Sequence, residues 1–161
     1  MIHILTHFSY CFVKLNDMVI GVIGRRDIEK PVVRMWLFGI IMLIEMLLAK
    51  EIRRRWPDGN WEQHVSKGRL EKAKELKAER ERRGYYPDLV DCLQLPDKLY
   101  IMLTEPVFVK DMGFASIRAA KRAIRELESL RNALAHGQDI TTRDWPPIVR
   151  LARRIQQLYS G

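Results

Sequence analysis

Three polar residues near the end of a predicted helix carry side chains that together could break a phosphodiester bond. They are Arg131, Asn132 and His136, in the segment 129–137, SLRNALAHG. A histidine exchanges protons near neutral pH. An arginine binds a phosphate through paired N–H groups and stabilises the negative charge that builds on it, and an asparagine can orient either partner. These residue types suit RNA cleavage by the RNA's own 2′-hydroxyl, which needs a proton acceptor, a proton donor and a cation but no metal.

A long amphipathic pattern predicts the helix that must position these residues. Its apolar residues recur at steps of three and four, at Ile117, Ala120, Ile124, Leu127 and Leu134. Ser116 is a typical start and Gly137 a typical stop for a helix. Arg131 stands where the apolar stripe lacks a member, so we expect its guanidinium to face the core and to meet a carboxylate, a phosphate or a second subunit. Asn132 precedes His136 by four residues, which places both on neighbouring faces.

The same residues also have a purely structural interpretation. Arginine and histidine are favoured near the C-terminal end of a helix because their positive charge complements the helix dipole. Residue type and spacing alone therefore leave two alternatives open for Arg131 and His136, a chemical role and a stabilising role at the helix end.

The segment 128–137, ESLRNALAHG, resembles the signature of the HEPN superfamily, the small helical domains of many prokaryotic toxin and defence ribonucleases. That signature is an arginine, usually followed by a polar residue, with a histidine four to six residues further on, and Arg131, Asn132 and His136 match it. The resemblance in helical layout extends from about Val32 to the C-terminus. It implies an antiparallel four-to-five-helix bundle, and a homodimer whose two motifs line one cleft.

The resemblance also implies a function, because active members of the superfamily are metal-independent endoribonucleases. His136 would then move a proton, Arg131 would hold the scissile phosphate, and Asn132 would orient the phosphate or the imidazole. One histidine cannot perform both proton transfers from one position, whereas the two His136 side chains of a homodimer can. Two alternatives stay open. One is a non-catalytic module that binds RNA or a nucleotide, and the other is a regulatory domain whose cleft a partner such as an antitoxin covers.

Composition and charge favour a globular chain with an anionic partner. The 161 residues are 47% hydrophobic and carry a formal net charge of +8, which suits RNA, an acidic protein or a membrane surface. We expect RNA-backbone contacts at two basic clusters, which are Arg82 with Arg83, and Arg150 with Arg153 and Arg154. A solvated helix face is the alternative interpretation of the first cluster.

Cysteine use and the apolar runs predict a cytoplasmic protein. Cys11 and Cys92 form no CxxC pair, so neither a disulfide nor a zinc site is predicted. The sequence shows no cluster of metal ligands and no phosphate-binding loop, so we expect no metal ion and no cofactor. The apolar run Met35–Ala49 is short for a membrane span and contains Glu45, which predicts a core helix and no membrane partner.

Glu45 should be partly buried within this run, and a buried carboxylate needs a cation. Because Arg131 is expected on a core-facing stripe without a partner, we hypothesise that the two side chains meet across the first and fourth helices. Glu45 would then support the motif by orienting Arg131. Pairing of Glu45 with Lys50 or with a surface arginine is the alternative.

The chain divides into a β-rich extension, residues 1–30, and a helical domain, residues 31–161, so the fold class is all-α with a small N-terminal β-hairpin. Strand-forming runs at 10–15 and 18–23 flank the turn pair Asn16-Asp17. The stretch 21–28, GVIGRRDI, resembles the last strand and turn of a CBS module, which implies a truncated remnant. Helices are expected at 33–55, 61–83, 89–104 with a break or kink at Pro96, 116–136, and from Asp144 onward. Residues 105–113 are expected to be a connection.

Overall fold

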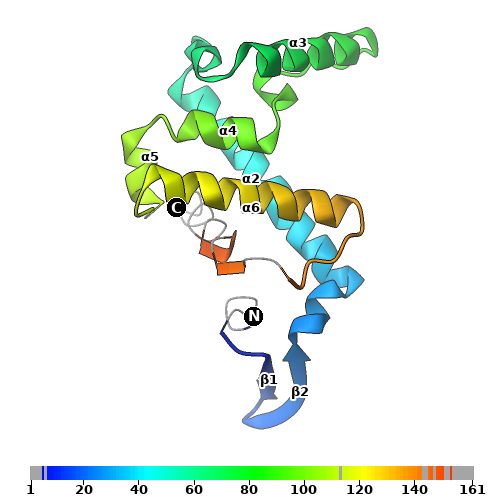
Figure 1. Ribbon diagram of the computed structural model, residues 1–161. Coiled ribbons are helices and arrows are strands. Elements are labelled where there is room, and N and C mark those ends of the chain that lie inside the picture. The colour runs from blue at the N-terminus through cyan, green and yellow to red at the C-terminus, as the bar shows by residue number, and fades with distance from the viewer. Residues whose placement is uncertain are drawn as a thin grey trace.

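The computed structural model shows a mostly helical chain with one small hairpin at its N-terminal end (Figure 1). The structure describes residue 5 and residues 7–112, 114–142, 145–146, 148–150 and 153. The predicted fold class, all-α with an N-terminal β extension, is confirmed.

The hairpin pairs β1, Tyr10–Leu15, with β2, Met18–Gly24, in antiparallel register. Asn16 and Asp17 form its turn with φ of 48° and 61°, a left-handed pair that asparagine and aspartate tolerate better than most residues. The predicted hairpin is therefore confirmed. Large apolar side chains on it stay exposed, among them Tyr10, Phe12, Leu15, Met18, Val19, Ile20 and Val22.

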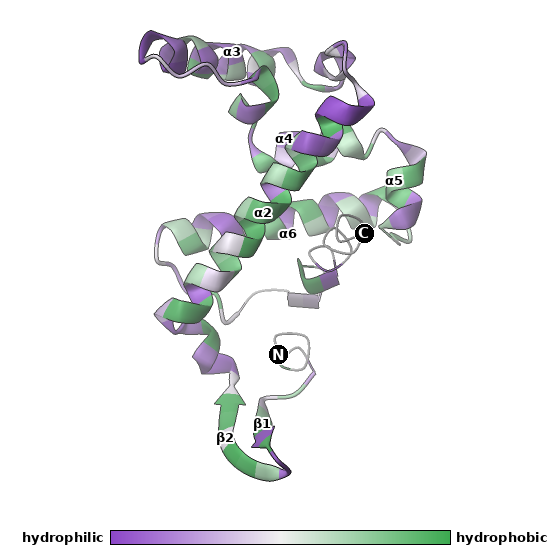
Figure 2. Cartoon of the chain, turned by 180° about the vertical axis from the view of Figure 1, so that it is seen from behind, coloured by the Kyte–Doolittle hydropathy of each residue, from purple (hydrophilic) through white to green (hydrophobic). Residues whose placement is uncertain are grey.

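A short turn of 3-10 helix, η1 at Arg25–Glu29, leads into the central helix α2, Pro31–Arg55. Pro31 lies in the first turn of α2, where its missing N–H costs no helical hydrogen bond. One face of α2 is buried through residues at helical spacing, namely Leu37, Ile41, Ile44, Leu48 and Ile52. Figure 2 shows that α2 is apolar along much of its length, whereas α3 is largely polar.

The helix expected at 61–83 is two elements. The 3-10 helix η2 covers Asn60–His64, and α3 covers Lys67–Arg82. The chain is extended at Ser66, with φ −64° and ψ 147°, so the helical hydrogen bonds are interrupted there. Ala73 is the buried residue of α3, which agrees with a solvated helix.

The helix expected at 89–104 is also divided, as its proline suggested. η3 covers Leu89–Cys92 and α4 covers Leu95–Met102, with Pro96 in the first turn of α4. The expectation that 105–113 is only a connection is wrong, because Pro106–Asp111 forms the short helix α5. Pro106 starts this helix in the same way that Pro31 starts α2.

The helix α6, Ile117–Ala135, begins and ends as predicted. The Ser116 Oγ accepts a hydrogen bond from the Ala119 amide at 3.1 Å, and the helix stops before Gly137, whose φ is 66°. Most of the helix expected from Asp144 onward lies outside the described residues. Within the described part, Trp145 and Ile148 are buried.

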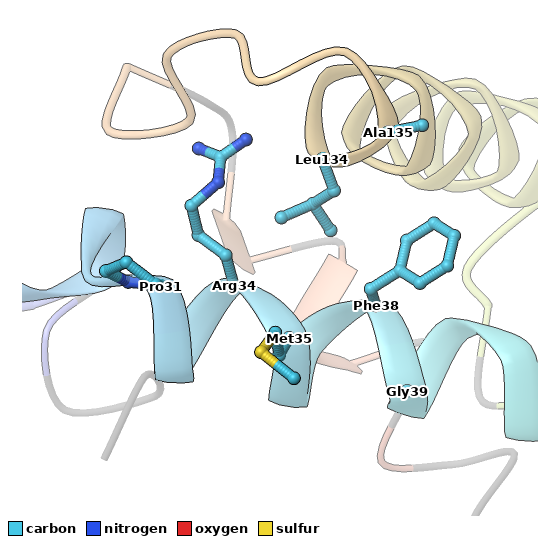
Figure 3. Close-up of a pocket in the computed structure, with 7 residues that line it drawn as sticks. All are labelled: Pro31, Arg34, Met35, Phe38, Gly39, Leu134 and Ala135. Atoms are coloured by element: carbon cyan, nitrogen blue, oxygen red, sulfur yellow. The ribbon is translucent and has the colours of Figure 1, made fainter.

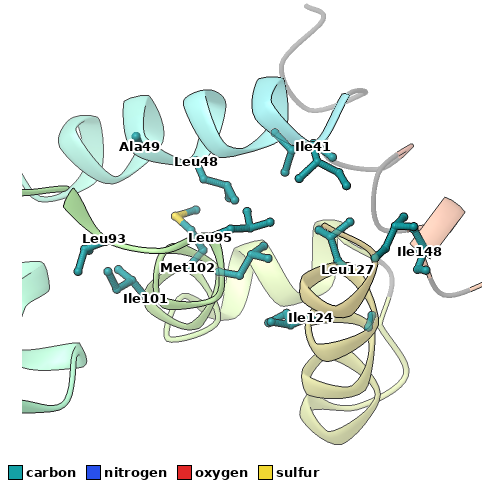
Figure 4. Close-up of a cluster of buried hydrophobic side chains, with 14 of the residues drawn as sticks. Ile41, Leu48, Ala49, Leu93, Leu95, Ile101, Met102, Ile124, Leu127 and Ile148 are labelled. Atoms are coloured by element: carbon teal, nitrogen blue, oxygen red, sulfur yellow. The ribbon is translucent and has the colours of Figure 1, made fainter. Parts of the chain in front are cut away.

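The core lies where α4 and α6 pack against α2 (Figure 4). Its largest fully buried side chains include Ile44, Leu48, Leu99, Met102, Ile124 and Leu127, which come from all three helices. Among the helices of the described residues, α2 alone has the length and apolar composition that crossing a membrane would need. α4 and α6 cover one side of α2, and the other side stays exposed at Met35, Met42 and Met46.

Candidate functional site

The three motif residues lie at the C-terminal end of α6, and all three are exposed. Leu130 and Ala133 are the buried residues of this part of the helix. The expectation that Arg131 faces the core is therefore wrong. At this end of α6 the start of α2 is a neighbour, since Arg34 donates to the Ala133 carbonyl, whereas Arg131 lies in solvent.

The Arg131 guanidinium is turned toward Asn132, since its Nη1 donates to the Asn132 Oδ1 at 3.2 Å. Arg131 and His136 are five residues apart, which places them about 140° from each other around the helix. Asn132 and His136 are neighbours on one face, and the His136 amide donates to the Asn132 carbonyl at 3.0 Å. The contact with Asn132 thus brings the guanidinium toward the side of α6 that carries His136.

His136 is the C-cap of α6, with φ −104° and ψ 10°. The helix closes with a left-handed residue at Gly137, and the Gln138 amide donates back to the Ala133 carbonyl at 2.9 Å. This geometry is a Schellman motif, which satisfies carbonyl groups that the end of a helix otherwise leaves unpaired. The backbone of His136 is therefore set by the turn that follows it.

Two residues from the other end of the chain contact this turn, and neither was identified from the sequence. The Arg34 guanidinium donates to the carbonyl oxygens of Ala133 at 3.0 Å and Gln138 at 2.9 Å. Arg34 is also paired with Glu29, whose carboxylate accepts from the amide of Ile140 at 2.6 Å. The signal available in the sequence was a charged residue within the apolar run that opens α2.

An apolar groove of about 720 Å³ lies beside the motif (Figure 3). Its lining comes from the start of α2 and the end of α6, and consists of Pro31, Arg34, Met35, Phe38, Gly39, Leu134 and Ala135. Leu134 and Ala135 are close in sequence to Arg131, Asn132 and His136, but none of these three residues lines the groove.

Glu45 does not meet Arg131, and the hypothesis that it orients this arginine is wrong. The Glu45 Oε1 accepts from the Lys98 Nζ at 2.7 Å, and the Lys98 Nζ also donates to the Leu93 carbonyl at 2.9 Å. The alternative partners, Lys50 and a surface arginine, are likewise replaced by this buried lysine of α4. Arg34, which contacts the motif turn, is eleven residues before Glu45, or about 16 Å along α2.

The first basic cluster, Arg82 with Arg83, lies apart from the motif. Arg82 and Arg83 are exposed at the end of α3, and Arg83 is paired with Glu79. Figures 1 and 2 show α4 between α3 and α6, so one protomer does not bring this cluster to the motif. Arg150 and Arg153 are exposed, and Arg154 lies outside the described residues.

Within the part of the chain that the structure describes, no three His, Cys, Asp or Glu residues are grouped as a metal site would require. Cys11 is half-buried and Cys92 is buried, and both are free thiols. Burial raises the pKa of the Cys92 thiol, which keeps it protonated and unreactive at neutral pH.

Comparison with known proteins identifies a family for this arrangement. A family model described as Swt1-like HEPN matches residues 41–159. The matched part contains most of α2, all of α3 to α6, and the motif. No curated protein and no solved structure matches the chain.

Proposed function

Because the chain belongs to the Swt1-like HEPN family, we propose that it is a metal-independent endoribonuclease of the toxin or defence type. The observation that carries the proposal is the exposed set Arg131, Asn132 and His136 at one end of α6. A helix-end role for these residues would require only charge, whereas the contact of Arg131 with Asn132 brings together two side chains whose N–H groups can bind a phosphate, at the same end of α6 as His136.

In the proposed reaction the ribose 2′-oxygen attacks the adjacent phosphorus and the bond to the 5′-oxygen of the next nucleotide breaks. One His136 accepts the 2′-hydroxyl proton, and a second donates a proton to the leaving 5′-oxygen. Arg131 stabilises the charge that builds on the phosphoryl oxygens. The products are a 2′,3′-cyclic phosphate and a free 5′-hydroxyl.

Two histidines in one cleft require two copies of the chain, and the exposed face of α2 supports this part of the proposal. Val32, Met35, Gly39, Met42 and Met46 follow one another at alternating steps of three and four, the spacing at which helices pair. Val32, Met35 and Met46 are 72%, 74% and 66% exposed. A Cβ at Gly39 would meet nothing within 4 Å, so packing inside the protomer does not require this glycine. A glycine in a helix interior costs about 1 kcal/mol relative to alanine, and close approach of a second helix would explain its presence.

The test is cleavage of a mixed RNA pool by the purified full chain in the presence of EDTA, beside the variant His136→Ala. We expect cleavage by the wild type, at least a hundredfold slower cleavage by the variant, and cyclic phosphate ends on the products. His64→Ala is the control, because His64 is also exposed but lies in η2. Equal cleavage by wild type and His136→Ala would contradict the proposal.

A non-catalytic module is the second candidate function, and the Arg131–Asn132 contact favours it to the same extent. These two side chains could hold the phosphate of an RNA or a nucleotide without any proton transfer. RNA binding that Arg131→Ala abolishes, without cleavage by the wild type, would identify this function.

A further inference from the structure

We infer that Arg34 and Glu29 are positioning residues for the motif, and that their ion pair fixes the turn that carries His136. The inference rests on the proposed function, since it assigns these residues to the same site. Neither residue belongs to the arginine–histidine motif, and both lie about a hundred positions before it in the sequence.

The contacts hold the turn on both sides of Gly137. Arg34 Nη2 donates to the Ala133 carbonyl at 3.0 Å, before the turn, and Arg34 Nη1 donates to the Gln138 carbonyl at 2.9 Å, after it. Glu29 Oε2 accepts from Arg34 Nη1 at 2.6 Å, and its other oxygen, Oε1, accepts from the Ile140 amide at 2.6 Å. One ion pair thus binds the chain at three points, and His136 lies between the first and the second.

The chemistry of the two side chains suits this task. A guanidinium presents several N–H groups in one rigid plane, so Arg34 serves two carbonyl oxygens and a carboxylate from two nitrogens, whereas a lysine has its three donors on one nitrogen and cannot reproduce this planar arrangement. The Arg34 side chain is 15% exposed and that of Glu29 is 33% exposed, so solvent competes only partly for these hydrogen bonds. Ile140 is fully buried directly after the turn, which anchors the far side.

The ion pair of Arg34 and Glu29 adds to the Schellman turn, because that turn fixes the backbone of His136 relative to α6 but not relative to α2. Gly137 has a φ of 66° and no side chain that would restrict its backbone. The body of α6 is held in the core by Ile124, Leu127 and Leu130, so the helix stays in place when Arg34 is changed. Substitution of Arg34 instead lets the last turn of α6 move relative to α2. A displacement of about 1 Å can slow a reaction by about a hundredfold.

The experiment compares RNA cleavage by the wild type, Arg34→Lys and Glu29→Gln. Arg34→Lys keeps the charge and loses the planar fork, and Glu29→Gln keeps an acceptor oxygen and loses the ion pair. We expect each to lower kcat at least tenfold with KM for RNA within twofold of the wild type, and to speed amide hydrogen exchange at Ile140. Arg53→Lys is the matched control, because Arg53 also pairs with two carboxylates, of Asp88 and Asp91, but at a distance from the motif.

The outcomes separate this inference from the proposed function. Unchanged kcat and unchanged Ile140 exchange in both variants, with an active wild type, would overturn the positioning role and leave the ribonuclease proposal standing. An inactive wild type would contradict the ribonuclease proposal. In that case the NMR chemical shifts of the His136 ring are compared between the wild type and Arg34→Lys. Unchanged shifts would overturn the positioning role. If Arg34→Lys unfolds, the same measurements on Glu29→Gln decide the question.

Discussion

Lys98 Nζ lies 2.7 Å from Glu45 Oε1 and joins α4 to α2 through an ion pair that is almost closed to solvent. The side chain of Lys98 is 3% exposed and that of Glu45 is 19% exposed. Removal of one partner leaves an uncompensated charge among apolar side chains, whereas removal of both does not.

We therefore expect Lys98→Met to lower the free energy of unfolding by about 3–5 kcal/mol. The double variant Glu45→Leu with Lys98→Met should recover most of that loss. Urea unfolding of the two single variants and the double variant measures the coupling as a double-mutant cycle. Additive losses in the cycle would mean that the pair is not coupled as its geometry indicates. RNA cleavage by the folded double variant should match the wild type, because the pair lies apart from the motif.

A charge on the exposed face of α2 should separate the proposed dimer. Met35 is 74% exposed and lines the groove beside the motif, so Met35→Glu would bring two like charges into an apolar interface. We expect the dimer dissociation constant to rise about a hundredfold, measured by sedimentation equilibrium, and cleavage to fall as the dimer dissociates. Tyr86→Glu is the control, since Tyr86 is 79% exposed but lies beyond α3. A variant that sediments as the wild type does would exclude this face as the interface.

Stability should depend on pH through Glu51. Hydrogen bonds from the guanidinium groups of Arg54 and Arg55, the former being the larger effect, lower the pKa of the Glu51 carboxyl from 4.5 against the opposing effect of burial. Because the folded pKa lies below the unfolded value, the interaction stabilises the fold above about pH 4.5 and is lost as the pH falls through the folded pKa.

Glu51→Gln should therefore be less stable than the wild type at about pH 7, and the difference should shrink as the pH falls below about 4.5. Thermal unfolding of both proteins across this range gives the comparison. Glu75→Gln, on an exposed position of α3, serves as the control and should show little difference at either pH. A stability gap for Glu51→Gln that widens on acidification would show that the sign of the pKa shift is wrong.

Local sequence was sufficient where a structure is determined by neighbouring residues. The hairpin follows from the pair Asn16-Asp17 between two β-rich runs, and α6 follows from Ser116, Gly137 and the apolar period between them. The motif was found for the same reason, because its three residues lie within one short segment. Its exposure was not predicted, because Arg131 was assigned to the apolar stripe, whereas Leu130, three residues after Leu127 and four before Leu134, is the member that is buried.

The contacts that were missed join residues far apart in the chain. Glu45 meets Lys98 across 53 positions, and Arg34 meets Ala133 across 99. Charge alone indicated that Glu45 needed a cation, but several cations were available and only the packing of α4 selects one. The short helix α5 was missed because its six residues, Pro106–Asp111, are too few to show a helical period in the sequence.

The ion pair of Arg34 and Glu29 also sets an order of events during synthesis. Both residues are made about a hundred positions before their partners Gln138 and Ile140. Contacts so distant in sequence form late, because the long intervening segment must first be brought together. We therefore expect that a growing chain that has not yet reached Ile140 holds no organised His136, so the proposed site is not assembled before that residue has been added.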